Sequence, residues 1–147
     1  MDAHTGIEKT PFNFKQAAAV CIFHGGTVCL GLRSPISSSF CGYWAPFGGE
    51  IEEGENPMLA AVRELKEETE ITLEVSDLQY MQEIQNDNGC RYILYAYHSP
   101  KLILPNLNFE HLESGYFKVD SIKQSPSPLC SQVANAILSY EARRWKP

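Results

Sequence analysis

Acidic side chains gather in one short segment of the chain, where Glu64, Glu67 and Glu68 lie within five residues. In an α-helix, which turns by about 100° per residue, these three carboxylates fall on one face. Like charges that share a helix face repel each other, so the face needs a cation to compensate it. Carboxylate oxygens suit a hard divalent ion. The segment therefore predicts a metal site for Mg²⁺, with Mn²⁺ as a substitute.

The residues around these acids follow a longer pattern. In order they are Gly49, five residues, Glu55, seven residues and then Arg63-Glu64-Leu65-Lys66-Glu67-Glu68. This spacing resembles the signature of the Nudix hydrolase family, and the preceding Trp44-Ala45-Pro46-Phe47-Gly48-Gly49 resembles the family as well. One position departs from the family pattern, which has glycine where this chain has Glu70.

A simpler explanation exists for an acidic helix. Such helices are commonly solvated faces that carry ion pairs between residues four apart, and Arg63 with Glu67 is one candidate pair. That explanation does not account for the glycine-containing loop, Glu55 and Arg63, which all stand at the matching offsets. We therefore place the functional site in this segment.

The resemblance implies an enzyme that hydrolyses a nucleoside diphosphate linked to another group. This reaction needs neutralised phosphate charge and a nucleophilic water, and divalent ions held by Glu64, Glu67 and Glu68 can supply both. Gly48 and Gly49 allow the backbone to approach ion and substrate closely, and the Gly49 carbonyl is a candidate further ligand.

Two arginines have expected roles around the ion. Arg63 and Glu55 are expected to pair, bracing the loop against the helix and orienting the metal ligands. Arg33 follows a predicted strand and is a candidate phosphate contact, because its planar fork matches two phosphate oxygens. The alternative for Arg33 is an ordinary surface arginine at a strand end.

The base that activates water is expected to be a glutamate of the signature, and an acid on a later loop is the alternative. In the family it is either a glutamate of the signature or an acid on a later loop. Residues 108–113 resemble that loop, which we expect to be a mobile wall of the pocket. Glu110 and Glu113 are its candidate bases, and His111 is expected to be a neighbour rather than a catalytic group.

The substrate is predicted only as a class. The leading prediction is Mg²⁺-dependent cleavage of a nucleoside triphosphate, or a modified deoxynucleoside triphosphate, to the monophosphate and pyrophosphate, as in MutT-like enzymes. The alternatives are ADP-ribose, a nucleotide sugar or a dinucleoside polyphosphate, and a non-catalytic nucleotide-binding sensor. Candidate aromatic contacts to the base are Phe12, Phe14, Tyr43, Tyr80, Tyr92 and Tyr97.

Hydrophobic periodicity indicates the elements that position the site. Strands are predicted over 15–23, 27–33, 78–84, 90–98 and 115–119, and 105–112 is predicted as a loop. A first helix begins at Asn56-Pro57, and a second at Ser127-Pro128, with Leu129, Val133 and Ile137 on one stripe. Strands between two amphipathic helices predict an α/β/α sandwich with a mixed central sheet.

Length and composition limit the remaining alternatives. The 147 residues are expected to form one domain, 1–147, with 1–14 as an irregular N-terminal tail. A net charge of −6 without a basic stripe disfavours binding to nucleic acid. No apolar run is long enough to span a membrane. Five cysteines without C-x-x-C spacing indicate a cytoplasmic protein with reduced thiols. We expect a monomer or homodimer.

Overall fold

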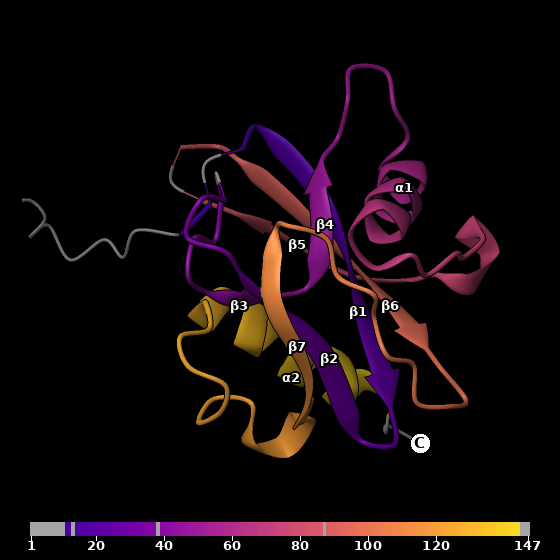
Figure 1. The fold of residues 1–147 in the computed structure, drawn as a ribbon, viewed down its shortest axis with the longest axis vertical. Coiled ribbons are helices and arrows are strands. Elements are labelled where there is room, and N and C mark those ends of the chain that lie inside the picture. Colours follow the sequence, from indigo (N-terminus) through magenta and orange to yellow (C-terminus); the bar gives the residue numbers. More distant parts are fainter. Residues whose placement is uncertain (1–10, 13, 38, 87, 145–147) are drawn as a thin grey trace, which may run out of the picture.

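The computed structural model describes residues 11–12, 14–37, 39–86 and 88–144. In this part of the chain a mixed 7-stranded sheet lies between two helices (Figure 1). The elements are β1 (Gln16–His24), β2 (Thr27–Arg33), β3 (Trp44–Ala45), β4 (Phe47–Glu50), α1 (Pro57–Thr69), η2 (Val75–Asp77), β5 (Gln79–Gln85), β6 (Arg91–His98), β7 (His111–Lys118), η3 (Val119–Ser121) and α2 (Ser131–Arg144). The predicted α/β/α sandwich is confirmed.

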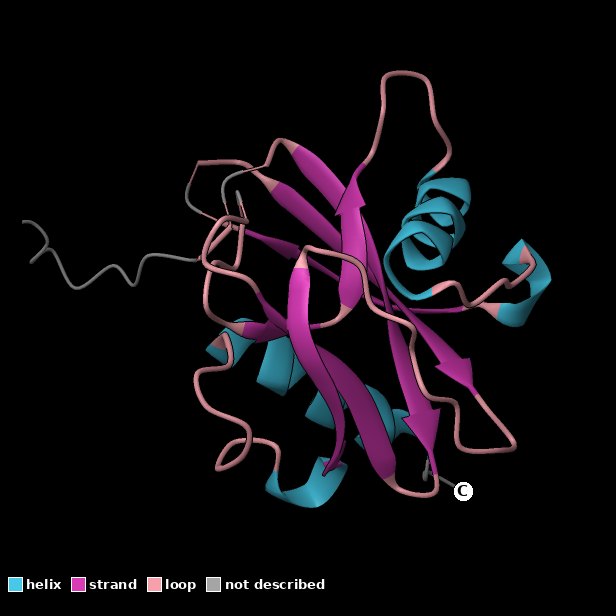
Figure 2. Cartoon of the chain, viewed as in Figure 1, coloured by secondary structure: helices cyan, strands magenta, loops and turns pink. Residues whose placement is uncertain are grey.

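Strand β1 lies at the centre of the sheet, and its residues from Ala17 to Phe23 are all buried. It pairs in parallel with β6 and antiparallel with β2 and β4. Its side chains alternate between two hydrophobic clusters, one packed against α1 and the other against α2. The two helices therefore cover opposite faces of the sheet, as Figure 2 shows.

Helix α1 begins where the sequence predicts and ends at the position where the family has glycine. The Asn56 side chain accepts hydrogen bonds from the Met58 and Leu59 amides, at 2.8 and 3.4 Å. The helix ends at Glu70, whose backbone is left-handed with φ 63° and whose amide donates to the Lys66 carbonyl at 2.9 Å. Glu70 thus adopts the conformation that favours glycine, and the helix does not continue through it.

The second helix begins later than predicted, at Ser131 rather than Ser127. The preceding segment is bound to the edge of the sheet instead. The Pro128 carbonyl accepts a hydrogen bond from the Trp44 amide at 2.9 Å, and Leu129 forms a bridge with Trp44. Leu129 therefore lies outside the helix whose stripe it was predicted to share.

The predicted loop over 105–112 and strand over 115–119 are also corrected. Strand β7 spans His111–Lys118 and pairs with β2 along its whole length, with Arg33 opposite His111 after an irregularity at Leu32/Arg33. Strand β7 forms because the edge of β2 is available for pairing. The sequence of β7 has no period-two pattern that would have predicted it. The short strands β3 and β4 were likewise not predicted.

The predicted N-terminal tail is packed where the structure describes it. Phe12 and Phe14 are buried, and their rings stack with centroids 4.8 Å apart. Both also contact Phe40 and Tyr92. Residues 1–10 and 13 of the predicted tail lie outside the described residues. Among the described helices, none is long and apolar enough to cross a membrane.

Candidate functional site

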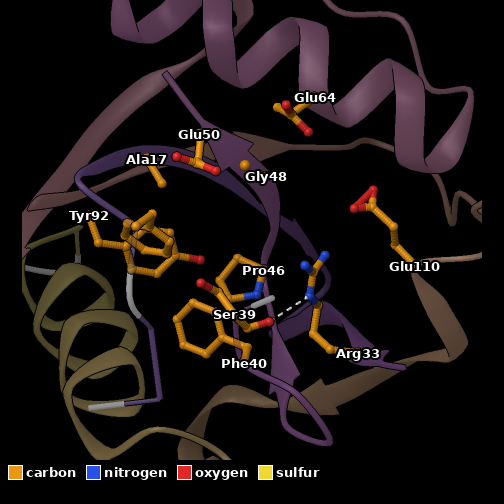
Figure 3. Close-up of a pocket in the computed structure, with 12 residues that line it drawn as sticks. Ala17, Arg33, Ser39, Phe40, Pro46, Gly48, Glu50, Glu64, Tyr92 and Glu110 are labelled. Atoms are coloured by element: carbon orange, nitrogen blue, oxygen red, sulfur yellow. Dashed lines mark hydrogen bonds between the residues drawn. The ribbon is translucent and has the colours of Figure 1, made fainter. Parts of the chain in front are cut away.

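A pocket of about 170 Å³ lies beside β4 and is lined by residues from α1, the end of β2 and the segment before β7. Its charged lining residues are Arg33, Glu50, Glu64 and Glu110 (Figure 3). Gly48 and Gly49 of β4 also line it. The structure thus brings together predicted site residues from distant parts of the chain, between the helix and the strand that carries Arg33.

Glu68 is buried beside this pocket, with only 1% of its surface exposed. Its Oε1 accepts a hydrogen bond from the Gly48 amide at 3.1 Å, whereas its Oε2 is buried and has no hydrogen-bond partner. Burial raises the pKa of Glu68 to about 9, and the nearby Glu110 and Glu64 add to the rise against the opposing charge of Arg33. A cation bound at Oε2 would favour the ionised carboxylate and so lower the pKa of Glu68.

Glu64 occupies the next turn of the same helix face and is about 15% exposed. Burial raises its pKa, and the neighbouring Glu67 adds to the rise. A Cβ on Gly49 would lie 2.5 Å from the Glu64 carboxylate, so only glycine at this position lets the helix carboxylate approach the strand backbone. This close approach puts backbone and carboxylate oxygens of the pocket near one another.

Arg63 is paired as predicted. Its Nε and Nη2 donate to the two carboxylate oxygens of Glu55 at 2.8 and 2.9 Å, in a two-pronged pair. Hydrogen bonding to Arg63 lowers the pKa of Glu55. The same guanidinium donates to Glu64 at 2.9 Å and to the Glu50 carbonyl at 3.2 Å. Arg63 therefore ties the loop, the strand and the helix together beside the pocket.

The third predicted carboxylate is placed differently. Glu67 is 55% exposed, and its Oε2 lies 3.4 Å from Arg63 Nη1, the nitrogen that also donates to Glu64. The described residues contain no set of three Asp, Glu, His or Cys side chains close enough to hold a metal ion. The predicted three-carboxylate cluster is therefore not preformed. The charge of Glu67 is compensated in part by Arg63, which is the ion pair that the simpler explanation for an acidic helix proposed.

Arg33 is not the surface arginine that the sequence left open, because only 8% of it is exposed. Its Nε donates to the Ser39 carbonyl at 3.2 Å, and its Nη1 lies 3.6 Å from Glu68 Oε2. These contacts hold the guanidinium in the pocket wall with its charge toward the buried carboxylate. Arg33 is the only cationic side chain among the described residues that line the pocket.

The two later acids have different positions. Glu110 lines the pocket at the end of the segment before β7, which is bound to the last turn of α1 through Asn108. Glu113 lies within β7, exposed and opposite Leu32, and is not part of the lining.

His111 is buried, its Nε2 lies 4.0 Å from Glu68 Oε1, and neither ring nitrogen is hydrogen bonded. Burial and Arg33 lower the pKa of His111 to about 4, so the ring is neutral at pH 7.

Several pocket residues were missed by the sequence analysis. Glu50, Phe40 and Pro46 line the pocket, and the aromatic wall of Phe14 and Tyr92 includes two of the predicted candidates. Glu50 lies two residues after Gly48 in the same strand, so the period of two would have indicated it once β4 was recognised. Tyr80, another candidate, is 61% exposed on β5 and does not line the pocket.

The arrangement can hold a divalent ion and a polyphosphate side by side. Glu68 offers a buried oxygen without a hydrogen bond, Glu64 and Glu110 are further carboxylates nearby, and the backbone of Gly48 and Gly49 lies close to Glu68 and Glu64. Such an all-oxygen donor set fits Mg²⁺ or Mn²⁺. Arg33 supplies a fixed positive group for phosphate oxygens.

Comparison with known proteins agrees with this geometry. A model of the NUDIX domain matches residues 13–134. Among solved structures, a MutT protein from Methanosarcina mazei Go1 is 18% identical with a TM-score of 0.75, covering 94% of this chain and 100% of that one. A C. elegans Ap4A hydrolase in a binary complex is 22% identical with a TM-score of 0.64, covering 87% and 97%.

A third similar structure is the NUDIX domain of Shewanella oneidensis NrtR complexed with ADP ribose. It is 16% identical with a TM-score of 0.70, and the match covers 91% of this chain and 90% of that one. At these identities the structural likeness concerns the fold. A search of curated proteins finds no match.

Proposed function

Because the chain belongs to the NUDIX family, and is therefore a phosphoanhydride hydrolase, we propose that it cleaves a nucleoside triphosphate, or a modified deoxynucleoside triphosphate. The products are the nucleoside monophosphate and pyrophosphate, and the reaction depends on Mg²⁺. The observation that carries the proposal is the buried Oε2 of Glu68, which has no hydrogen-bond partner and lies beside a pocket lined by Glu64, Glu110 and Arg33.

Glu68, Glu64 and a main-chain carbonyl of Gly48 or Gly49 would hold the ion, with Glu67 turning inward from Arg63 if a further carboxylate is needed. When bound, the ion supplies neutralisation of phosphate charge and a lowered pKa of its water. The surrounding residues have separate tasks. Arg33 binds and orients phosphate oxygens, and its hydrogen bond to the Ser39 carbonyl fixes its direction.

Glu110 is placed to accept the proton of the attacking water. Its segment is bound to the C-terminal end of α1 through Asn108, and the Glu110 amide is fixed by a hydrogen bond to Asn108 Oδ1 at 2.9 Å. The glutamates of α1 are then free to act as ligands, while Glu113 has no part in the chemistry. Arg63 and Glu55 do not touch the substrate and act by keeping Glu64 and the glycine backbone in position.

The size of the pocket supports a mononucleotide substrate. A cavity of about 170 Å³ is smaller than the roughly 300–1,000 Å³ typical of sites for drug-sized ligands. It can enclose one end of a nucleotide, with the polyphosphate reaching toward the carboxylates. The second candidate is a larger substrate such as ADP-ribose, a nucleotide sugar or a dinucleoside polyphosphate, which the names of two similar structures favour.

A panel of nucleotide derivatives with Mg²⁺, Mn²⁺ or excess EDTA tests the proposal. Pyrophosphate release and a monophosphate product are expected from one or more triphosphates, only with a divalent ion. Glu68→Gln and Glu64→Gln should each lower kcat about 100-fold or more, whereas the exposed Glu53→Gln should leave kcat unchanged. Full turnover in EDTA would refute the metal dependence, and cleavage restricted to larger derivatives would establish the second candidate. Binding without turnover would indicate a sensor.

The same proposal covers the setting in which the protein works. We take residues 1–147 to act as a single domain, as a monomer or homodimer that binds a small nucleotide and neither nucleic acid nor membrane. All five cysteines are free, which supports a reducing compartment such as the cytoplasm.

A further inference from the structure

The pocket continues away from the carboxylates of α1 as a slot on the other face of the sheet. In the sheet, Ala17 of β1 lies directly opposite Glu50 of β4 on one side and Tyr92 of β6 on the other. Directly opposed residues of paired strands point to the same face. Glu50, Ala17 and Tyr92 therefore form one row, with the smallest side chain in the middle.

Small residues and aromatic rings shape this slot. Gly48 lies opposite Ala19 in the neighbouring row, so the floor between Glu50 and Tyr92 carries little side-chain bulk. Phe14, Phe40 and Tyr92 contact one another along one wall. Aromatic side chains interact favourably with the faces or edges of a nucleobase, so this wall suits the base of a nucleotide.

Charge divides the pocket into two ends. In Figure 3, Glu50, Ala17 and Tyr92 lie to one side of Gly48, and Arg33 and Glu110 lie to the other. Arg33 is the only cationic side chain among the described residues that line the pocket, so the polyphosphate belongs at the Arg33 end. The uncharged part of the nucleotide then occupies the end that carries Glu50.

The Glu50 carboxylate is free to bind a ligand. Within the described part of the chain it takes part in no hydrogen bond or ion pair, and only its backbone carbonyl is engaged, by Arg63 Nη2 at 3.2 Å. The backbone is further fixed by the pairing of Glu50 with Ala17. The side chain thus projects from a rigid strand into the pocket lining without a partner in the protein.

We propose that Glu50 determines base specificity by accepting two hydrogen bonds from the N–H edge of guanine bound in this slot. The inference rests on the proposed function in one respect, that the ligand of the pocket is a nucleotide. It adds the base class and the residue that selects it.

The preference for guanine follows from hydrogen-bond chemistry. A carboxylate presents two parallel acceptors and no donor. Guanine offers two adjacent donors, N1–H and the 2-amino group, which match both oxygens at once. Adenine and cytosine offer one amino group beside a ring nitrogen whose lone pair faces the second oxygen. Uracil offers one N–H between two carbonyl oxygens, and both of these repel a carboxylate.

Equilibrium binding of nucleoside monophosphates by calorimetry tests this inference without requiring turnover. The ligands are GMP, IMP, CMP and UMP, and IMP lacks the 2-amino group while keeping N1–H. The wild-type protein should bind GMP about tenfold or more tightly than UMP, with IMP between them. Glu50→Gln, which keeps the size of the side chain, should reduce the GMP-to-UMP ratio to near one. The matched control is Glu53→Gln, at an exposed glutamate of the loop that follows β4. It should keep the wild-type ratio.

Three results would overturn the inference: equal affinities of the wild-type protein for the four ligands, a ratio that survives in Glu50→Gln, or equal weakening of all four by that variant. The last result would move Glu50 to the sugar or phosphate. The proposed function fails separately. If Glu50 selects guanine but no triphosphate is hydrolysed, the base assignment stands and the pyrophosphohydrolase assignment falls. If triphosphates are hydrolysed without base preference, the pyrophosphohydrolase assignment stands and the base assignment falls.

Discussion

Replacing Glu68 with Gln should change how the stability of the metal-free protein depends on pH. Glu68 is 1% exposed, and burial raises its pKa to about 9 from 4.5. Gln has nearly the same shape and its amide oxygen can still accept the hydrogen bond from the Gly48 amide. The substitution therefore removes the ionisable group while keeping the packing, so that any pH-dependent difference between the two proteins reports on this carboxyl.

The direction follows from proton binding. Between pH 4.5 and 9 the folded protein holds a proton on Glu68 that the unfolded chain releases. The stabilisation due to this proton is complete below pH 4.5 and is lost as the pH rises toward 9. At about 1.4 kcal/mol per pH unit, raising the pH from 5 to 8 should lower the free energy of unfolding by about 4 kcal/mol relative to Glu68→Gln.

Urea unfolding in EDTA at intervals from pH 5 to pH 8 measures this difference. The variant should gain stability relative to the wild type at each step, and Glu53→Gln should follow the wild type. Adding Mg²⁺ at pH 8 should stabilise the wild type more than Glu68→Gln, because the ion favours the ionised carboxylate. A difference between wild type and variant that stays constant across the pH range would refute the inferred burial of an uncompensated carboxyl.

Three further experiments, with four substitutions, test the residues in and around the site. In a double-mutant cycle, Glu55→Gln and Arg63→Gln should show a coupling of about 1–2 kcal/mol in stability, because their pair is two-pronged; strictly additive losses would contradict a direct pair. Glu70→Gly should raise the free energy of unfolding by about 1 kcal/mol, because φ at this position is 63°, and should leave kcat within a few-fold; a loss of metal binding would make Glu70 a ligand. Arg33→Lys should raise KM for triphosphates about tenfold, since it removes the planar fork, and an unchanged KM would remove Arg33 from the site.

Local signals in the sequence were sufficient for the parts of the fold that depend on neighbours in the chain. Asn56 and Pro57 mark the start of α1 because capping and the first helical turn involve only adjacent residues. The turn at Gly25-Gly26 has positive φ at both glycines and joins β1 to β2 as its residues indicate. In these cases the physical cause lies within a few residues of its effect.

The remaining features depend on contacts between distant segments. Strand β7 starts at His111 because Arg33 and the edge of β2 are there to pair with it. The segment before Ser131 stays out of α2 because Trp44 binds Pro128. Glu67 forms an ion pair with Arg63, an alternative that the spacing of the acids could not decide. A local pattern contains no information about which of these partners will be within reach.

The charges around Glu68 explain why the site should favour an ion over a permanent internal partner. His111 is the nearest group besides Arg33 that could carry a positive charge, yet its lowered pKa of about 4 leaves it neutral at pH 7. Arg33 lies 3.6 Å from Glu68, beyond hydrogen-bond distance, and does not prevent the rise of the Glu68 pKa. A closer arginine would stabilise the metal-free protein and compete with the cation. The fold therefore leaves one buried oxygen without a hydrogen bond, and under the proposed function a divalent ion bound there would recover the stability that this oxygen costs.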